Sequence, residues 1–247
     1  MKTRMFLMMA ALVLSVSSCR VGLSNGFGER LEPSENIVKA KYPQEPFDKI
    51  DNHVACKMQV VQSKDNKSRV TLSAPENYIE LFEFKNENGE LDIKFVERNV
   101  NIDADDVTII IYTPNIREIE NSGAAEICMD SLTTTELEVK NSGVGAFTMS
   151  NVKARKLDVS CSGVGSITIS GETDEAKYNC RGVGNINAQD MKAHRVEAKI
   201  SGVGGIECYA SDYIKGRVTG VGGLKYAGHP AKKDLHSSMT GGISEIE

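Results

Sequence analysis

The sequence predicts an all-β fold: a right-handed parallel β-helix, or β-solenoid, with about 20 residues per coil and irregular N-terminal strands capping one end. Two observations support this prediction. A short glycine motif returns at nearly constant spacing in the second half of the chain, and the residues around it alternate between apolar and polar. Constant spacing of this size indicates a solenoid, and alternation with a period of two indicates strands with one buried face.

The glycine motif opens with Ser, Arg or Thr and most often reads Ser-Gly-Val-Gly. Successive motifs start 20, 20, 19, 20, 18 and 21 residues apart, counting a shortened last motif that opens at Thr240. We expect both glycines to lie where the coil bends, because a side chain there would collide with the core or because φ is positive. A phosphate-binding loop is a poorer explanation, since neither Lys-Ser/Thr nor a helix follows. The predicted glycine ladder consists of Gly123, Gly143, Gly145, Gly163, Gly165, Gly182, Gly184, Gly202, Gly204, Gly220 and Gly222.

The strands on both sides of the motif are predicted from the alternation. With the residue that opens a motif counted as zero, position five is apolar in every full coil, and so is the position five residues before the next motif. Charged and polar residues separate these positions, so one face is expected to be buried and the other wet. Parallel stacking of coils about 4.8 Å apart then pairs each strand with its equivalents. The apolar positions are Ile127, Phe147, Ile167, Ile186, Ile206 and Leu224 after the motif, and Leu137, Leu157, Ala176, Val196, Ile214 and Leu235 before the next one.

The residue between the two glycines is valine in five motifs, and its parity is the one that faces solvent elsewhere. If the alternation continues through the bend, these valines form an exposed apolar strip, a candidate surface for self-association or ligand docking. If the chain rotates at the corner, the valines turn inward instead. The sequence leaves both geometries open. The valines are Val144, Val164, Val183, Val203 and Val221.

The N-terminus has the parts of a lipoprotein signal peptide. Lys2 and Arg4 give a positive start, and residues 5–16 form an apolar run too short to span a bilayer. Small residues then lead to Cys19, the pattern that bacterial lipoprotein signal peptidase reads. We therefore predict removal of residues 1–18, lipidation of Cys19 and attachment to a membrane through this lipid. An ordinary cleavage site with an incidental cysteine is the alternative.

The part of the chain before the first glycine motif is less regular. Asn88-Gly89 predicts a hairpin between strands at 80–85 and 91–96. We expect this part to continue the solenoid and cap one end, although a separate small β-domain also fits. The expected segments are the signal peptide (1–18), a tether (19–43), the irregular β part (44–121) and the regular coils (122–247).

Charge and composition narrow the function classes. The net charge is −5, and loss of Lys2 and Arg4 with the signal peptide makes it more negative, which argues against nucleic acid as a partner. No catalytic, cofactor-binding or metal site is predicted, because no motif for one occurs. The acidic cluster Asp103, Asp105 and Asp106 lacks the glycine and terminal glutamate of a calcium loop. The histidines, interpreted as surface residues, are His53, His194, His229 and His236.

Two of the cysteines fall at equivalent positions. Cys161 and Cys180 each precede a glycine motif in successive coils, where stacking brings Cα atoms about 4.8 Å apart, within disulfide range. In-register parallel pairs seldom reach disulfide torsions, so we favour two small buried hydrophobic residues, with the disulfide as the alternative. The other cysteines after Cys19 are Cys56, Cys128 and Cys208.

These motifs resemble one known family, the putative auto-transporter adhesin, head GIN domain family of Bacteroidetes-type lipoproteins. The resemblance rests on the Ser-Gly-Val-Gly ladder and on the stretches 188–197 and 226–230, and it extends from about Pro46 to the end. Two features depart from the family: the literal Gly-Ile-Asn tripeptide is absent, and valine replaces the commonly polar residue between the glycines. The resemblance implies a β-helical fold and an exported location.

Together these features predict an exported, lipid-anchored β-helical protein that binds rather than catalyses. We expect an adhesin-like role, in which the solenoid presents a rigid face to a glycan or protein partner or to its own copies. A structural or envelope-stress lipoprotein facing the periplasm is the alternative. A β-helix polysaccharide-degrading enzyme is a second alternative, for which no converging carboxylates are visible. The expected location is the cell envelope, as an outer-membrane lipoprotein facing the periplasm or the surface.

Overall fold

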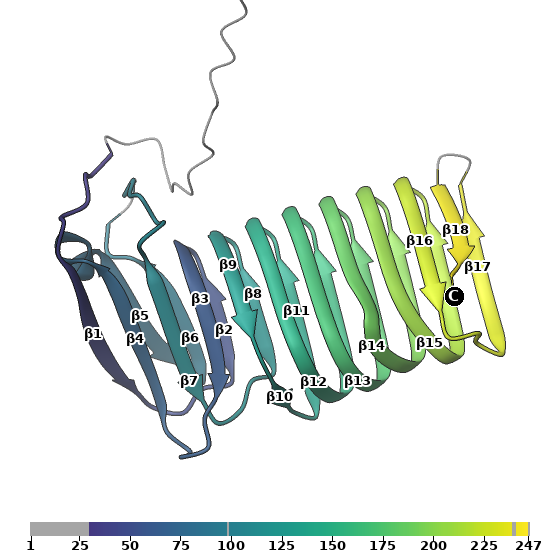
Figure 1. The fold of residues 1–247 in the computed structure, drawn as a ribbon, viewed down its shortest axis with the longest axis horizontal. Helices are drawn as coiled ribbons and strands as arrows, with labels where there is room; N and C mark the ends of the chain where they lie inside the picture. The colour runs from purple at the N-terminus through teal and green to yellow at the C-terminus, as the bar shows by residue number, and fades with distance from the viewer. Residues whose placement is uncertain (1–29, 98, 239–240, 247) are drawn as a thin grey trace, which may run out of the picture.

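The computed structural model describes residues 30–97, 99–238 and 241–246, which form one stack of β-coils (Figure 1). The strands belong to a single 18-stranded sheet wound round one apolar core. The predicted all-β solenoid with coils of about 20 residues is therefore confirmed. The N-terminal elements are β1 (Ile37–Gln44), β2 (Lys49–Asn52), β3 (Ala55–Gln62), β4 (Ser68–Pro75), the 3-10 helix η1 (Glu76–Leu81), β5 (Phe82–Glu87), β6 (Glu90–Phe95), β7 (Thr108–Thr113), β8 (Glu118–Asn121) and β9 (Ala124–Met129). The later elements are β10 (Leu132–Thr133), β11 (Glu136–Asn141), β12 (Val144–Cys161), β13 (Val164–Cys180), β14 (Val183–Ile200), β15 (Val203–Val218), β16 (Val221–Ala227), β17 (Lys232–Ser237) and β18 (Gly241–Glu245).

Equivalent residues of successive coils stack on one another inside the solenoid. Phe147 of β12 pairs with Ile167 of β13, and both are at most 1% exposed. A second interior row passes from Val159 through Tyr178 to Ala198. A large side chain in one coil is thus followed by a small one in the next, which keeps the core filled without strain.

The glycine motif forms a tight corner between two strands of each coil. A Cβ on Gly143 would lie 2.0 Å from the carbonyl oxygen of Gly123, and one on Gly145 would lie 1.9 Å from that of Ala125. Gly145 and its equivalents also have positive φ, between 140° and 158°. A side chain at these corners would therefore collide with the backbone of the preceding coil, and not with the core as the sequence suggested.

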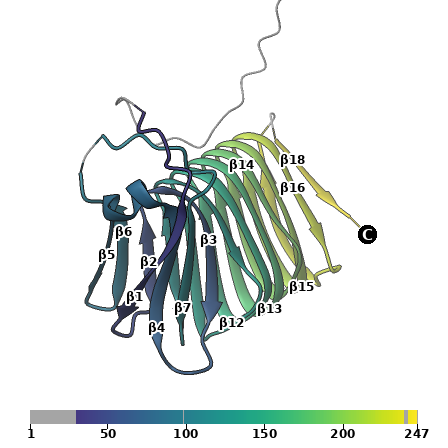
Figure 2. The ribbon, with the colours of Figure 1, turned by 60° about the vertical axis from the view of Figure 1, so that its left-hand side comes forward.

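The first coil along the chain is not the first coil of the stack. β2 pairs in parallel with both β6 and β8, and β3 pairs in parallel with both β7 and β9. The coil of β2 and β3 therefore lies between two coils that follow it in sequence (Figure 1). Antiparallel pairs of β1 with β4 and of β5 with β6 close this end (Figure 2).

The hairpin predicted at Asn88-Gly89 is confirmed. β5 and β6 are antiparallel and meet at this turn, where Asn88 has φ 53° and Gly89 has φ 81°. Both values suit the two-residue turns that match the twist of paired strands. The first strand begins at Phe82 and not at residue 80, because residues 76–81 form the short helix η1.

The last coil differs from the count made on the sequence. Gly241 pairs with Gly222, so the shortened motif lies two residues out of register with the others. As a result Leu235 stacks on Gly216, whereas the sequence pattern had placed it on Ile214. The leucine fills the space that the absent side chain of Gly216 leaves, since a Cβ there would lie 2.8 Å from its Cδ2.

A polar pair closes the C-terminal end of the core. Lys233 pairs in register with buried Ile214, and Glu245 with buried Tyr226, so both occupy positions that are apolar in earlier coils. The Lys233 ammonium lies 2.7 Å from the Glu245 carboxylate, to which the Tyr226 hydroxyl donates a hydrogen bond of 3.2 Å. Charged residues at inward positions end the apolar core here.

Candidate functional site

The valines between the glycines line up on the outside of the solenoid. Each is the first residue of its strand, from β12 to β16, and each of the first four pairs with the valine of the next coil. Their exposed fractions run from 50% to 57%. They face outward because the alternation continues through the bend: Val164 lies three residues before Ile167, which faces the core. This row, the valine strip, consists of Val144, Val164, Val183, Val203 and Val221.

The rows that flank the valine strip are small and almost uncharged. One row holds the residues that open the motifs, and the other holds the residues two positions after the valines. Arg181 is the only charged residue in these two rows. The surface therefore offers apolar area with little charge to desolvate on contact. The rows are Ser142, Ser162, Arg181, Ser201 and Thr219 on one side, and Ala146, Ser166, Asn185, Gly205 and Gly223 on the other.

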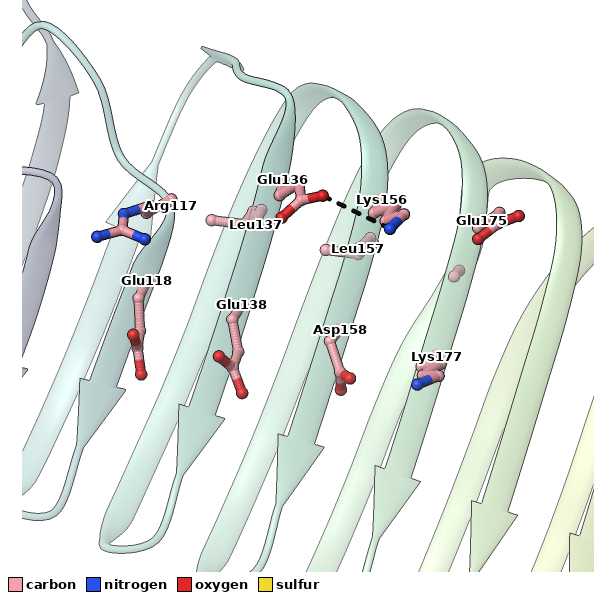
Figure 3. Close-up of a pocket in the computed structure, with 11 residues that line it drawn as sticks. Arg117, Glu118, Glu136, Leu137, Glu138, Lys156, Leu157, Asp158, Glu175 and Lys177 are labelled. Atoms are coloured by element: carbon pink, nitrogen blue, oxygen red, sulfur yellow. Dashed lines mark ion pairs between the residues drawn. The ribbon is translucent and has the colours of Figure 1, made fainter.

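A groove of about 350 Å³ lies on the sheet formed by β8, β11 and the second halves of β12 and β13 (Figure 3). Glu118, Glu138 and Asp158 form a row of carboxylates across three coils, because they pair in register along the ladder. Lys177 continues the row in the next coil. The floor between these charges is apolar, with Leu137 and the next leucine along the ladder (Figure 3).

Several charges of this groove are paired within the protein, and Glu118 has two partners. The Glu118 carboxylate lies 2.9 Å from the Lys49 ammonium and 2.6 Å from that of Lys140. Burial acts to raise the pKa of Glu118, but the two lysines outweigh it and the pKa is lowered. Burial raises the pKa of Asp158, against the opposing effect of Lys177. A charged ligand that binds at Glu118 would have to replace these two ion pairs.

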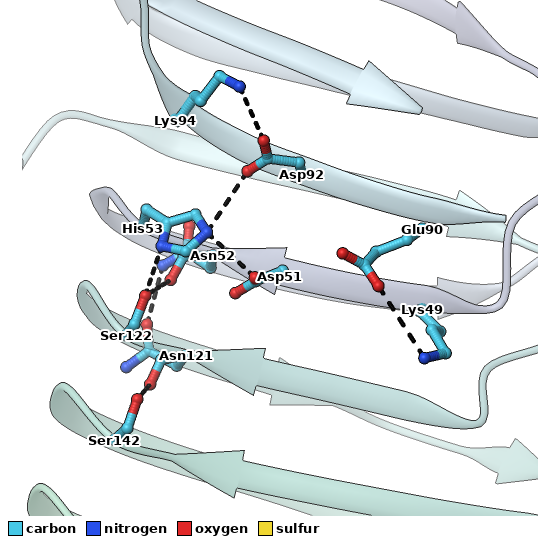
Figure 4. A network of polar contacts seen from close by, with 10 residues as sticks. All are labelled: Lys49, Asp51, Asn52, His53, Glu90, Asp92, Lys94, Asn121, Ser122 and Ser142. Carbon is cyan, nitrogen blue, oxygen red and sulfur yellow. Dashed lines mark hydrogen bonds and ion pairs between the residues drawn. The ribbon is translucent and has the colours of Figure 1, made fainter. Parts of the chain in front are cut away.

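His53 lies in a polar network that local sequence spacing did not reveal (Figure 4). Its Nδ1 is 2.6 Å from the Ser122 hydroxyl, and its Nε2 is 3.1 Å from Asp51 and 3.4 Å from Asp92. The insertion of β2 between β6 and β8 brings these residues together. The sequence gives one weak sign of this network. Asn52 pairs in register with Asn121, the residue before the first glycine motif, so residues 52–55 occupy the place of a degenerate motif.

The order of hydroxyl, imidazole and carboxylate resembles an acyl-transfer triad, but the two backbone amides beside the hydroxyl are already bonded. The amides of Ser122 and Gly123 both donate to the carbonyl oxygen of Asn52, at 2.8 Å and 3.0 Å. These amides are therefore occupied and do not form an oxyanion hole. What the network does in this structure is hold the inserted coil against its neighbours.

A buried ladder of amides and thiols runs behind the glycine corners. The Nδ2 of Asn52 donates to Asn121 at 2.9 Å, and that of Asn121 donates to Asn141 at 3.0 Å. Cys161 and Cys180 follow in register as buried free thiols. Burial raises the pKa of the Cys180 thiol to about 11, so this thiol is neutral at physiological pH and behaves as a small packing residue.

The remaining candidates do not gather into a site. Within the described ranges no group of three or more His, Cys, Asp or Glu side chains could hold a metal ion, and Asp103 is bonded to Arg30. Cys19 and the predicted signal peptide lie outside the described residues. Over the part of the chain that is described, no helix has the length and apolar character to cross a bilayer. Each of the other histidines contacts a carboxylate: His194 with Asp212, His229 with Glu245 and His236 with Asp234.

Known proteins share this fold and part of this sequence. The family model described as putative auto-transporter adhesin, head GIN domain, matches residues 46–230. The crystal structure of a putative adhesin from Bacteroides fragilis NCTC 9343 is 30% identical, with a TM-score of 0.85 over 87% of this chain and 100% of its own. A putative lipid binding protein and a putative adhesin, both from Parabacteroides distasonis ATCC 8503, are each 20% identical and show the fold alone. Their TM-scores are 0.70 and 0.66, over 89% and 88% of this chain and 100% of their own. No curated protein matches the chain.

Proposed function

The chain belongs to the putative auto-transporter adhesin, head GIN domain family, and we propose that it is a lipid-anchored, adhesin-like binding protein without catalytic activity. The family and the B. fragilis structure carry adhesin names, which indicates a location in the cell envelope or at the surface. The proposal adds a lipid on Cys19, an outer-membrane location and a contact surface on the solenoid for a glycan or protein partner.

The observation that carries the proposal is the valine strip. Five half-exposed valines lie in one row on a rigid ladder, and the flanking rows hold one charge. Soluble proteins seldom keep a continuous apolar row of this kind uncovered, so it marks a contact surface. The ladder also fixes the valine positions before any partner arrives, which lowers the entropy cost of binding.

Binding measurements with variants of the strip test this role. We expect the labelled full chain to bind isolated envelope polysaccharide or envelope protein in a saturable way. The double change Val164→Lys and Val183→Lys should weaken this binding at least tenfold, because two hydrated ammonium groups replace two apolar contacts. The control is Thr135→Lys, which introduces the same charge at an exposed residue between β10 and β11, midway in sequence between two glycine corners. Equal binding by the double variant and the control would show that the strip is not the contact surface.

Protease treatment of intact cells tests the adhesin-like role itself. A surface-facing adhesin should lose its solenoid to an added protease while the cells stay intact. Protection of the solenoid until the outer membrane is opened would support the periplasmic structural role instead.

A further inference from the structure

We propose that the valine strip binds the valine strip of a second copy of this chain, in a dimer whose twofold axis runs along the strip. The dimer proposal rests on the proposed function in one respect, namely that the valine strip is a contact surface. It adds the identity of the partner, a second copy of the chain. In the dimer the two solenoids lie side by side, with their coils in the same order.

The spacing of the strip is matched by a second copy. Neighbouring valines lie one coil apart, about 4.8 Å, because they pair directly along the parallel ladder. A second strip has the same spacing, so each of the five valines can meet its own counterpart. A partner with a different repeat spacing could not stay in register with all five valines. Twofold contact of one patch with itself is also the commonest form of protein dimer.

Arg181 decides between the two ways in which a twofold axis can bring the strips face to face. An axis across the strip at Val183 would reverse one copy and set Arg181 against Arg181 of the second copy. An axis along the strip exchanges the flanking rows instead, so that Arg181 faces Asn185 of the second copy. The first arrangement opposes two like charges. The second gives the guanidinium the Oδ1 of Asn185, which already accepts from the Gly205 amide at 2.8 Å and has a second lone pair for Arg181. The charge therefore favours the parallel arrangement.

The other flanking residues fit the same arrangement. Each small hydroxyl side chain meets a small residue of the second copy, so the strips can approach closely and no further charge is buried. The facing pairs are Ser142 with Ala146, Ser162 with Ser166, Ser201 with Gly205 and Thr219 with Gly223.

The area of the strip suits a reversible dimer. Five half-exposed valines give an apolar patch of roughly 400 Å², the size at which patches on monomers mark interaction sites. A standard interface buries about 800 Å² on each partner, so the valines supply about half and the flanking rows the rest. The parallel order also puts the β1 strands of both copies at the same end, so that the segments before them can reach the same membrane. Confinement there raises the effective concentration, so a weak interface suffices.

Cysteine cross-linking on the full chain in its native membranes tests the arrangement. The exposed thiol of Cys128 is first removed by Cys128→Ser, because this thiol could itself form a disulfide between two copies. In this background Val144→Cys, Val183→Cys and Val221→Cys are each oxidised separately. The parallel dimer predicts a disulfide-linked dimer from each of the three variants. The control Thr135→Cys, at an exposed residue between β10 and β11, midway in sequence between two glycine corners, should stay monomeric.

Each outcome of the cross-linking has one meaning. A dimer from Val183→Cys alone would overturn the parallel arrangement, because only the central valine meets itself when one copy is reversed. No dimer from any strip variant would overturn the second copy as partner. In that case, a tenfold loss of envelope binding by Val164→Lys with Val183→Lys would still support the proposed function. The two proposals therefore fail separately.

The oligomeric state in solution gives a second measurement. For the solubilised full chain we expect a monomer–dimer equilibrium by analytical ultracentrifugation. Val164→Lys with Val183→Lys should raise its dissociation constant at least tenfold, while circular dichroism shows that the chain stays folded, because the valines lie outside the core. A wild-type chain that stays monomeric at the highest measurable concentration, with no cross-linking in membranes, would contradict the dimer.

Discussion

The two glycines of each motif are required for different reasons. Gly163 has no unusual φ, yet a Cβ on it would lie 2.0 Å from the carbonyl oxygen of Gly143. Gly184 combines a close approach, 1.8 Å from the carbonyl oxygen of Gly165, with φ 158°. The first position therefore excludes side chains through space, and the second through both space and backbone conformation.

The first prediction compares a corner glycine with an open one. Gly163→Ala should destabilise the fold by ~3 kcal/mol or more, because the backbone of two coils must separate. Gly242→Ala is the matched control, since a Cβ on Gly242 would meet nothing within 4 Å. Urea denaturation followed by circular dichroism measures both. Equal midpoints for the two variants would contradict the role of the corner.

The second prediction concerns Tyr178, whose side chain is fully buried. Its hydroxyl finds no hydrogen-bond partner among the described residues, and burial raises its pKa well above the usual value. Removing an unsatisfied hydroxyl relieves a desolvation cost, so Tyr178→Phe should leave stability unchanged or raise it by about 1 kcal/mol. Tyr178→Ala should cost about 3–5 kcal/mol, because a cavity replaces the ring beside Ala198. A large loss from Tyr178→Phe in thermal unfolding would show that the hydroxyl has a partner.

Among single residues, the sequence identified those whose role repeats. Interior positions such as Phe147 and Ile167 were predictable because period-two alternation recurs in every coil. The buried amides of Asn52 and Asn121 were not, because a polar residue gives no sign that a neighbour in another coil will satisfy it. The exposure of the valine strip stayed open until the backbone at the corner was known.

At the scale of elements, turns could be predicted from local sequence, whereas pairings between strands far apart in the chain could not. The hairpin of β5 and β6 followed from the Asn88-Gly89 turn, whose conformation depends on those two residues. The insertion of β2 between β6 and β8 has no local signal, since an apolar strand can pair with any equivalent neighbour. The Ser122, His53 and Asp92 network depends on that insertion and was missed for the same reason.

The third prediction concerns the polar cap made by the last two strands. Hydrogen bonds from Lys233 and then from His229 lower the pKa of Glu245 from 4.5 to about 2. A carboxylate with a lowered folded-state pKa contributes stability that is present above pH 4.5 and is lost as the pH falls towards 2. We expect protection of the amides of β17 and β18 against hydrogen exchange, corrected for intrinsic rates, to fall in this window. Glu245→Gln should show low protection at pH 6 and no further change between pH 4.5 and 2, whereas wild-type-like protection in this variant would contradict the role of the cap.

At the scale of the whole molecule, the repeat made the architecture predictable. Each coil can bury its apolar face only against neighbouring coils, so a 20-residue period fixes the stacking, the in-register pairing and the position of the core together. The two ends of the solenoid were less predictable, because the terminal coils depart from the repeat and so prevent further coils from stacking on them. The register shift of Gly241 against Gly222 and the charged pair Lys233 and Glu245 both arise there.

The last prediction links the anchor to the valine strip. Cys19→Ser should move the protein from the membrane fraction to the soluble fraction, or leave it unprocessed with its signal peptide, because the proposed acyl chains on Cys19 would supply the membrane affinity. Release also removes confinement to two dimensions, so the effective concentration of strips falls. The yield of cross-linked Val183→Cys dimer should therefore fall when Cys19→Ser is added, at equal total protein. Fractionation with mass spectrometry of the N-terminal peptide checks the first effect, and non-reducing electrophoresis checks the second. Unchanged membrane partitioning with unchanged mass would refute lipidation at Cys19, and an unchanged dimer yield after release would show that the strips associate without help from the membrane.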